Sequence, residues 1–142
     1  MAKSVMVIGL GRFGSSVART LFQLGFDVLG IDMDEKIVQS NVGQLTYSVQ
    51  GDATNEATLR DLGASNFDAS IVAIGTNMEV SLMASVLLAT LEAPLIIARA
   101  RDPLHGNTLQ RIGVHRIIYP EQEIGEVLAH SLFNPDVLEY MD

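Results

Sequence analysis

Short apolar runs alternate with segments of helical period along the whole chain, and Gly, Asn, Asp or Pro separates each pair. Residues 5–8 form an unbroken apolar run, which is typical of a parallel strand buried on both faces. By the same criteria, strands are predicted at residues 5–8, 28–32, 46–50, 69–74, 95–98 and 116–119. Strict alternation of strand and helix predicts a parallel sheet with right-handed crossovers and helices on both faces.

Helix signals lie between these strands. Asn77 precedes the clearest helix, in which apolar residues recur with the helical period. Asp102 followed by Pro103 is a cap and first-turn signature, and a last helix is predicted at residues 121–133. We therefore predict one α/β domain over residues 1–134. Its fold is a Rossmann-like, doubly wound parallel sheet of six strands in the order 3-2-1-4-5-6.

The glycine pattern G-x-G-x-x-G directly follows the first predicted strand and opens a helix, in the run Gly9-Leu10-Gly11-Arg12-Phe13-Gly14. This context between strand and helix makes the pattern informative. Gly9 permits the tight turn, Gly11 lets backbone N–H groups approach a phosphate, and Gly14 lets the helix pack close to the sheet. The start of the helix then offers N–H donors and the positive end of its dipole to an anion.

An acidic residue ends the second predicted strand. Asp32 lies 23 positions after Gly9, where a carboxylate accepts both ribose hydroxyls and repels a 2′-phosphate. The glycines and this acid together predict an adenosine nucleotide without a 2′-phosphate, such as NAD(H) or ATP/ADP, rather than NADP. The alternative is a glycine-rich turn and a capping Asp that hold no ligand.

Two later turns lie on the same carboxyl edge of the predicted sheet. One contains Asp52 and Ala53 and follows the third strand, and the other contains Gly75 and follows the fourth. At this edge Asp52 can accept from an adenine amino group while Ala53 packs on the ring. Alternatively, Asp52 and Thr54 only cap the next helix, and the pattern leaves both interpretations open.

Composition narrows the possible functions. The 142-residue chain carries a formal net charge of −8, so its overall field does not attract nucleic acid, and none is expected as a partner. The absence of cysteine excludes disulfides, zinc-thiolate sites and thiol catalysis. The longest uncharged apolar stretch, residues 80–91, is shorter than the roughly 20 residues that cross a bilayer. No direct membrane insertion is predicted, and any membrane link must run through a partner.

No group of residues predicts catalysis. His105, His115 and His130 have no metal-ligand spacing and are expected to be ordinary surface or partly buried residues. Arg99 and Arg101 point to the same side of the chain because they are two apart, either toward a phosphate or into solvent. Since no general base for a second substrate is evident, we predict a regulatory nucleotide-binding protein rather than an enzyme. The alternatives are the cofactor-binding half of an NAD-dependent oxidoreductase and a structural module with an empty crevice.

Four strings carry a resemblance to a known family: VIGLGRFG at 7–14, GDAT at 51–54, VAIG at 72–75 and RIGVHRIIYPE at 111–121. They resemble the RCK (KTN) domain, and the chain is most similar to the Ktr/Trk-type regulatory subunits of potassium transport. The resemblance covers nearly the whole chain, in order. It implies a cytoplasmic regulatory subunit of a potassium uptake system, held at the inner membrane by a K⁺ transporter subunit. Such a subunit binds NAD(H) or ATP/ADP in the glycine-rich crevice and switches conformation.

The resemblance also implies roles for single residues. Arg12 would reach the terminal phosphate of a nucleotide on a neighbouring subunit, Arg99 would face the phosphates, and Glu121 would help to hold a divalent cation. The last helix would be the crossover helix of a homodimer, and dimers would assemble into a homo-octameric ring. The candidate nucleotide-binding residues are Gly9, Gly11, Arg12, Phe13, Gly14, Asp32, Asp52, Ala53, Ile74, Gly75 and Arg99, and the candidate metal ligand is Glu121. Residues 135–142 are expected to be a linker toward a C-terminal domain that is absent from this chain.

Overall fold

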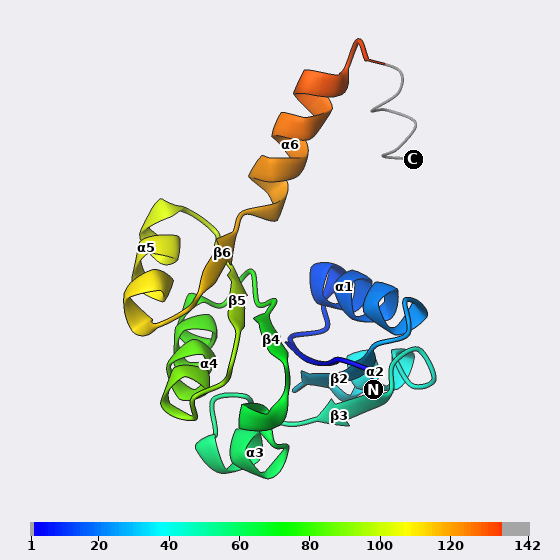
Figure 1. Cartoon of the computed structure of the whole chain (residues 1–142), viewed down its shortest axis with the longest axis vertical. Helices are drawn as coiled ribbons and strands as arrows, with labels where there is room; N and C mark the ends of the chain where they lie inside the picture. The colour runs from blue at the N-terminus through cyan, green and yellow to red at the C-terminus, as the bar shows by residue number, and fades with distance from the viewer. Residues whose placement is uncertain (1, 135–142) are drawn as a thin grey trace.

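Six parallel strands form one sheet in the order β3-β2-β1-β4-β5-β6 in the computed structural model, which describes residues 2–134 (Figure 1). The strands are β1 (Ser4–Ile8), β2 (Asp27–Asp32), β3 (Tyr47–Gln50), β4 (Ala69–Val72), β5 (Ile96–Arg99) and β6 (Arg116–Ile118). The predicted fold class and strand order are confirmed. β4 ends two residues earlier than predicted, which leaves Ile74 and Gly75 in the loop beyond it.

Helices cover both faces of the sheet. They are α1 (Arg12–Gln23), α2 (Glu35–Ser40), α3 (Glu56–Asp61), the 3₁₀ turn η1 (Ala64–Asn66), α4 (Met78–Thr90), α5 (Pro103–Ile112) and α6 (Pro120–Ser131). Figure 1 shows α1 and α2 on one side of the sheet and α3, α4 and α5 on the other. Side chains of asparagine or aspartate cap most of these helices, including Asn77 for α4 and Asp102 for α5, as predicted.

Each face of the sheet has its own core, and β1 contributes to both because successive strand residues point to opposite faces. Met6 and Ile8 pack with residues of α3, α4 and α5. Val5 and Val7 pack with residues of α1 and of the chain around α2. The unbroken apolar run of the sequence is thereby explained, since β1 is central in the sheet and hydrogen-bonded to β2 and β4.

The last helix departs from this layered arrangement. Figure 1 shows α6 projecting away from the sheet, and every residue from 121 to 130 is exposed. Its apolar positions face solvent, with Ile124 59% exposed and Leu128 47% exposed. Residues 135–142, the predicted linker, lie outside the described residues. Over residues 2–134, no helix has both the length and the apolar character needed to cross a bilayer.

Candidate functional site

The loop between β1 and α1 depends on its glycines for three different reasons. Gly9 has a φ of 93°, a conformation that favours glycine. A Cβ on Gly14 would stand 1.8 Å from the Gly9 carbonyl oxygen, so only glycine lets α1 approach the loop this closely. A Cβ on Gly11 would meet no protein atom within 4 Å, because Gly11 faces open space. These are the roles that the glycine pattern predicts.

The N-terminus of α1 is open to an anion. Gly11 is the N-cap and supplies no side-chain hydrogen bond, and the first turn contains no acidic residue. The first backbone N–H groups of a helix lack partners within the helix. This end of α1 therefore retains both the donors and the positive dipole that bind phosphate groups.

Asp32, at the end of β2, ties the second strand to the glycine loop. Its Oδ2 accepts a hydrogen bond from the Leu10 N–H at 2.8 Å, and its Oδ1 accepts one from the Asp34 N–H at 2.9 Å. A carboxylate has about four acceptor positions, and these bonds use two of them. Asp32 thus shapes the loop and can still accept hydroxyl groups.

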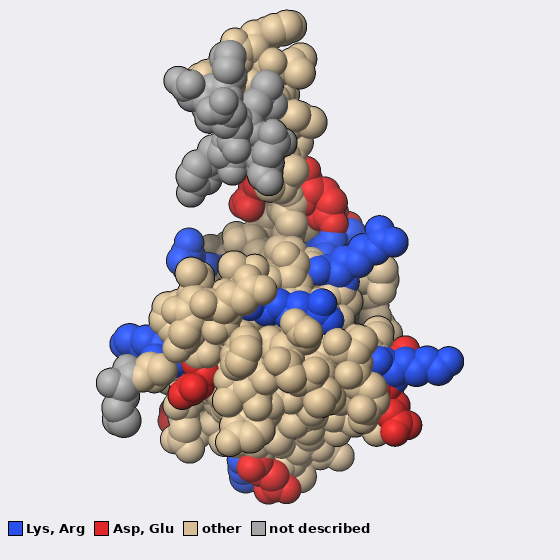
Figure 2. All heavy atoms as spheres, turned by 90° about the vertical axis from the view of Figure 1, so that its right-hand side faces the viewer, with Lys and Arg blue, Asp and Glu red and all other residues tan. Residues whose placement is uncertain are grey.

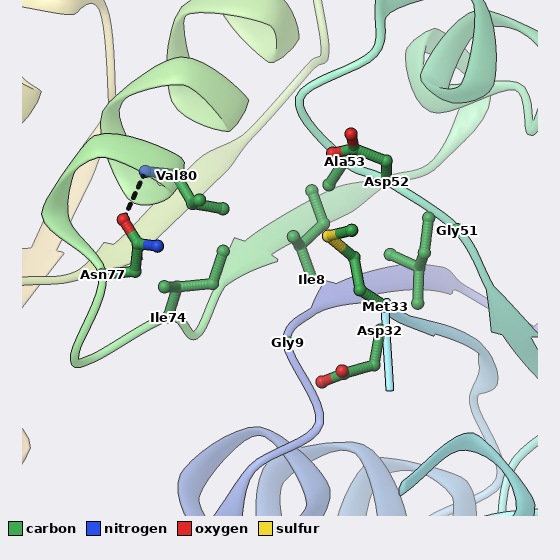
Figure 3. A pocket seen from close by; sticks show the side chains of 11 residues that line it. Ile8, Gly9, Asp32, Met33, Gly51, Asp52, Ala53, Ile74, Asn77 and Val80 are labelled. Atoms are coloured by element: carbon green, nitrogen blue, oxygen red, sulfur yellow. Dashed lines mark hydrogen bonds between the residues drawn. The ribbon is translucent and has the colours of Figure 1, made fainter. Parts of the chain in front are cut away.

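A cleft of about 240 Å³ lies between the carboxyl ends of β1, β2, β3 and β4. We call it the apolar cleft, because aliphatic side chains and glycines make up most of its lining (Figure 3). It is lined by Ile8, Gly9, Ile31, Asp32, Met33, Gly51, Asp52, Ala53, Ile74, Asn77 and Val80. In Figure 3 the Asp32 carboxylate points toward the loop that begins at Gly9, whereas Asp52 lies across the cleft beside Ala53.

Asp52 is held in a tight turn with Thr54. Its Oδ1 accepts hydrogen bonds from the Thr54 hydroxyl at 2.6 Å and the Thr54 N–H at 2.8 Å. These two bonds, the hydroxyl first, lower the pKa of Asp52 and keep it ionised. The helix α3 is capped instead by Asn55, whose side chain accepts from Thr58. The interpretation of Asp52 and Thr54 as caps of that helix is therefore wrong.

A second hollow of about 470 Å³ adjoins the apolar cleft, since Gly9 and Gly11 belong to one loop and Ile74 and Gly75 are successive residues. We call it the arginine hollow. It is lined by Gly11, Arg12, Phe13, Ala73, Gly75, Thr76, Arg99, Arg101 and Glu121. Figure 2 shows basic side chains gathered below the projecting helix, which carries acidic side chains on its first turns.

Arg99 is held in the wall of the arginine hollow by its neighbours. Its guanidinium carbon lies 5.3 Å from the centre of the Phe13 ring, within range for a cation–π contact. A Cβ on Gly75 would come within 3.0 Å of this guanidinium, so the glycine makes room for it. Arg99 also forms an ion pair with Glu121 at the start of α6. Arg12, by contrast, is exposed and forms no ion pair with any residue in the described range.

The linings of the apolar cleft and the arginine hollow together contain every predicted site residue except Gly14, which packs beneath the loop. Met33 and Val80 of the apolar cleft were missed by sequence reasoning. Met33 directly follows Asp32, and that position beyond a strand end was the available signal. Val80 begins the apolar stretch of residues 80–91, and no pattern distinguishes a residue of that stretch that lines a cleft from one that packs in the core.

One histidine differs from its prediction. His105, expected at the surface or partly buried, is 2% exposed. Its Nδ1 accepts a hydrogen bond from the Arg101 N–H at 3.0 Å, and its Nε2 lies 2.9 Å from the Ser81 hydroxyl. Burial lowers the pKa of His105 and favours the neutral ring. His105 therefore joins α5 to α4 and to the turn after β5, and it is not presented to a substrate.

Acidic and imidazole groups do not gather into a cation site within residues 2–134: no three His, Cys, Asp or Glu side chains there are arranged to hold a metal. Glu121, the predicted ligand, is engaged by Arg99 instead. Any cation at Glu121 would need further oxygen ligands from a nucleotide or from a second copy of the chain.

This geometry defines a nucleotide-binding protein of the Rossmann class, with a phosphate loop at the sheet's switch point and an acid at the end of β2. The chain belongs to the TrkA-N domain family, whose profile matches residues 5–120. The predicted membership of the RCK N-terminal family is confirmed.

Curated relatives agree with this family assignment, and solved structures share the fold. The chain is 41% identical over 140 residues to Ktr system potassium uptake protein A of Bacillus subtilis, an alignment covering 99% of this chain and 63% of the relative. The chain thus spans less than two thirds of that protein's length. The crystal structure of the TrkA-N domain of the Escherichia coli inner membrane protein ybaL matches with a TM-score of 0.82 at 20% identity, covering 93% of this chain and 98% of that one. The Kef C-terminal domain of Shewanella denitrificans, solved in an AMP-bound form, matches with a TM-score of 0.75 at 26% identity, covering 93% and 82%.

Proposed function

We propose that this chain is the nucleotide-sensing domain of a cytoplasmic regulatory subunit in a potassium uptake system. The observation that carries this proposal is that the apolar cleft and the arginine hollow adjoin each other at the carboxyl edge of the sheet. The apolar cleft has two carboxylates in its lining, and the arginine hollow is cationic and lies at the open N-terminus of α1. That combination suits an adenosine nucleotide, whose ends differ in the same way.

The adenosine half occupies the apolar cleft. Ala53 and Ile74 offer apolar contacts to a base, and Asp52 is ionised and can accept from its amino group. Asp32 accepts the ribose hydroxyls at its remaining acceptor positions. The AMP-bound form of the Kef domain supports this half of the proposal, because AMP contains an adenosine and one phosphate.

The phosphates rest on the backbone amides at the start of α1 and extend into the arginine hollow. NAD(H) and ATP/ADP share the adenosine diphosphate portion, whose second phosphate would reach Arg99, and they differ beyond it, toward Arg12. Arg12 has no ion-pair partner among the described residues, so it is available to a terminal phosphate of the same or a neighbouring subunit. Glu121 would take a divalent cation together with those phosphates.

Assembly and output depend on α6. Its exposed apolar residues, including Ile124 and Leu128, suit burial against a second copy of the chain, which makes α6 the crossover helix of a homodimer. Such dimers would form the homo-octameric ring beneath a membrane K⁺ transporter subunit. Nucleotides that favour different arrangements of the paired subunits would then gate that partner.

Calorimetric titration of the purified chain with ADP, ATP and NADH tests the proposal. We expect at least one of them to bind, with AMP competing at the same site. NADPH should bind more weakly than NADH, because Asp32 repels a 2′-phosphate, and Asp32→Arg should reduce that discrimination. Heat signals absent for all three ligands would leave a structural module with an empty crevice. Oxidation of NADH by an added substrate, seen only when the chain is present, would instead support the oxidoreductase alternative.

A further inference from the structure

Arg99 is already occupied by an anion from its own chain. Its guanidinium lies over Phe13 and against Gly75, and it pairs with the carboxylate of Glu121. The side chain of Arg99 is 20% exposed, whereas that of Glu121 is 71% exposed. The arginine is thus fixed in the wall of the hollow, and the glutamate reaches it from outside.

Among the described residues, this ion pair joins the start of α6 to the end of β5. No strand or other helix packs extensively on α6 among the described residues, and every position from 121 to 130 is exposed. Apart from the chain connection through Tyr119 and Pro120, the start of α6 is held to the domain by the bond between Glu121 and Arg99.

A carboxylate and a phosphate compete for the same donors on a guanidinium, because each can accept two parallel N–H···O bonds from arginine through two of its oxygens. They also repel each other when they share one site. We propose that Glu121 acts as a built-in competitor of the nucleotide phosphates for Arg99. When no cation bridges the two anions, a phosphate that reaches Arg99 displaces Glu121 and frees the first turn of α6. This inference rests on the proposed function, since it concerns the regulation of the same site.

The exposure of Glu121 makes the exchange feasible. An exposed ion pair contributes little free energy, so a phosphate held by several donors at once can replace it. The released α6 then takes up a different range of orientations. Ligands would be sensed by the reach of their phosphates toward Arg99, and α6 would carry the signal to whatever it contacts.

The first test compares ADP affinities of three chains in EDTA, which removes any contribution of a cation at Glu121. They are the wild type, Glu121→Gln and the matched control Glu123→Gln, which removes a charge from the same helical turn without touching Arg99. We expect Glu121→Gln to bind ADP about two- to five-fold tighter than the wild type, because the exposed ion pair that ADP must break contributes little free energy. The control should match the wild type.

Three results would overturn the inference while leaving the proposed function intact: equal ADP affinity in all three chains, weaker ADP binding by Glu121→Gln, or equal tightening in both variants, which would reflect general charge alone. A wild-type chain that binds neither ADP nor ATP nor NADH removes the proposed function and this inference with it.

The second test follows α6 directly. The chain contains no cysteine, so Ala57→Cys on α3 and His130→Cys on α6 can be spin-labelled uniquely, with dilution into unlabelled chains to suppress distances between copies. Adding ADP should change the distance distribution of the wild type and of Glu123→Gln. Glu121→Gln should already show the changed distribution without ADP. Distributions that stay the same in every chain, with and without ADP, would contradict the inference.

Discussion

The apolar cleft and the arginine hollow share one edge of the sheet but are built differently. The first is formed by strand ends and short turns whose backbone is fixed by hydrogen bonds, such as those that Asp32 accepts from Leu10 and Asp34. The second is formed largely by long side chains, and one of its walls is Glu121 of a helix that hardly touches the domain.

This difference suggests a division of labour. A preformed cleft recognises the part that all candidate ligands share, because rigid geometry costs nothing to organise on binding. A hollow of movable charges recognises the part that differs, and it can report the difference by moving. Changes in the cleft should therefore weaken the binding of all candidate ligands together, whereas changes in the arginine hollow should alter preference among ligands.

The largest effect is expected at the loop that both hollows share. Gly14→Ala forces a Cβ against the Gly9 carbonyl, which should lower the free energy of unfolding by about 1–3 kcal/mol and abolish ADP binding. Gly11→Ala is the matched control, because its Cβ meets no protein atom. It should retain most of the stability and still weaken ADP binding, since the Cβ stands where phosphates approach. Urea unfolding and calorimetry of both variants check this prediction, and an intact ADP affinity in Gly14→Ala would contradict it.

The next effect concerns the apolar cleft alone. Asp32→Asn should weaken ADP and NADH together by about 10-fold or more, because hydrogen bonds to a charged group contribute roughly 1.5–3 kcal/mol. Asp34→Asn is the control: Asp34 caps α2, and asparagine caps a helix about as well as aspartate. If Asp32→Asn changed the ratio of ADP to NADH affinity without weakening both ligands, the proposed division of roles between the apolar cleft and the arginine hollow would be wrong.

A smaller effect is expected in the arginine hollow. Arg12→Ala should reduce ATP affinity about 10-fold relative to ADP, because only ATP extends a further phosphate toward this cation. Arg60→Ala, which removes an exposed arginine from α3, controls for net charge. The measurement is the ratio of the two dissociation constants in each chain. A ratio that Arg12→Ala leaves unchanged would exclude Arg12 from discrimination.

The smallest effect concerns stability and pH. The pKa of His105 is lowered in the folded chain, so between that value and about 6.5 the unfolded chain binds more protons. Its contribution to stability is thus complete above about pH 6.5 and declines as the pH falls. Three carboxylates also have a lowered pKa, but they change the free energy of unfolding with pH only below about pH 4. They are Asp52, Asp68 and Asp102. Urea unfolding between pH 5 and 7 should show a weaker pH dependence in His105→Gln than in the exposed control His130→Gln, and equal slopes would contradict this assignment.

The same contrast between the hollows explains what the sequence could predict. Backbone features were predictable, because strand periodicity, glycine spacing and the acid after β2 are local patterns with one geometric outcome. The ion pair between Arg99 and Glu121 was not predictable from pattern, because it joins side chains 22 positions apart that the fold brings together. The projection of α6 was not predictable from periodicity either, since an apolar stripe has the same spacing whether its helix packs on its own domain or on another chain. The burial of His105 was missed because its two hydrogen-bond partners come from other elements.

A crystal structure of the chain with ADP tests the central claim most directly. The account predicts adenine in the apolar cleft, ribose hydroxyls at the Asp32 carboxylate, and phosphates at the backbone amides that open α1. ADP bound at another surface, or a crevice that stays empty at an ADP concentration that saturates the chain in solution, would contradict it.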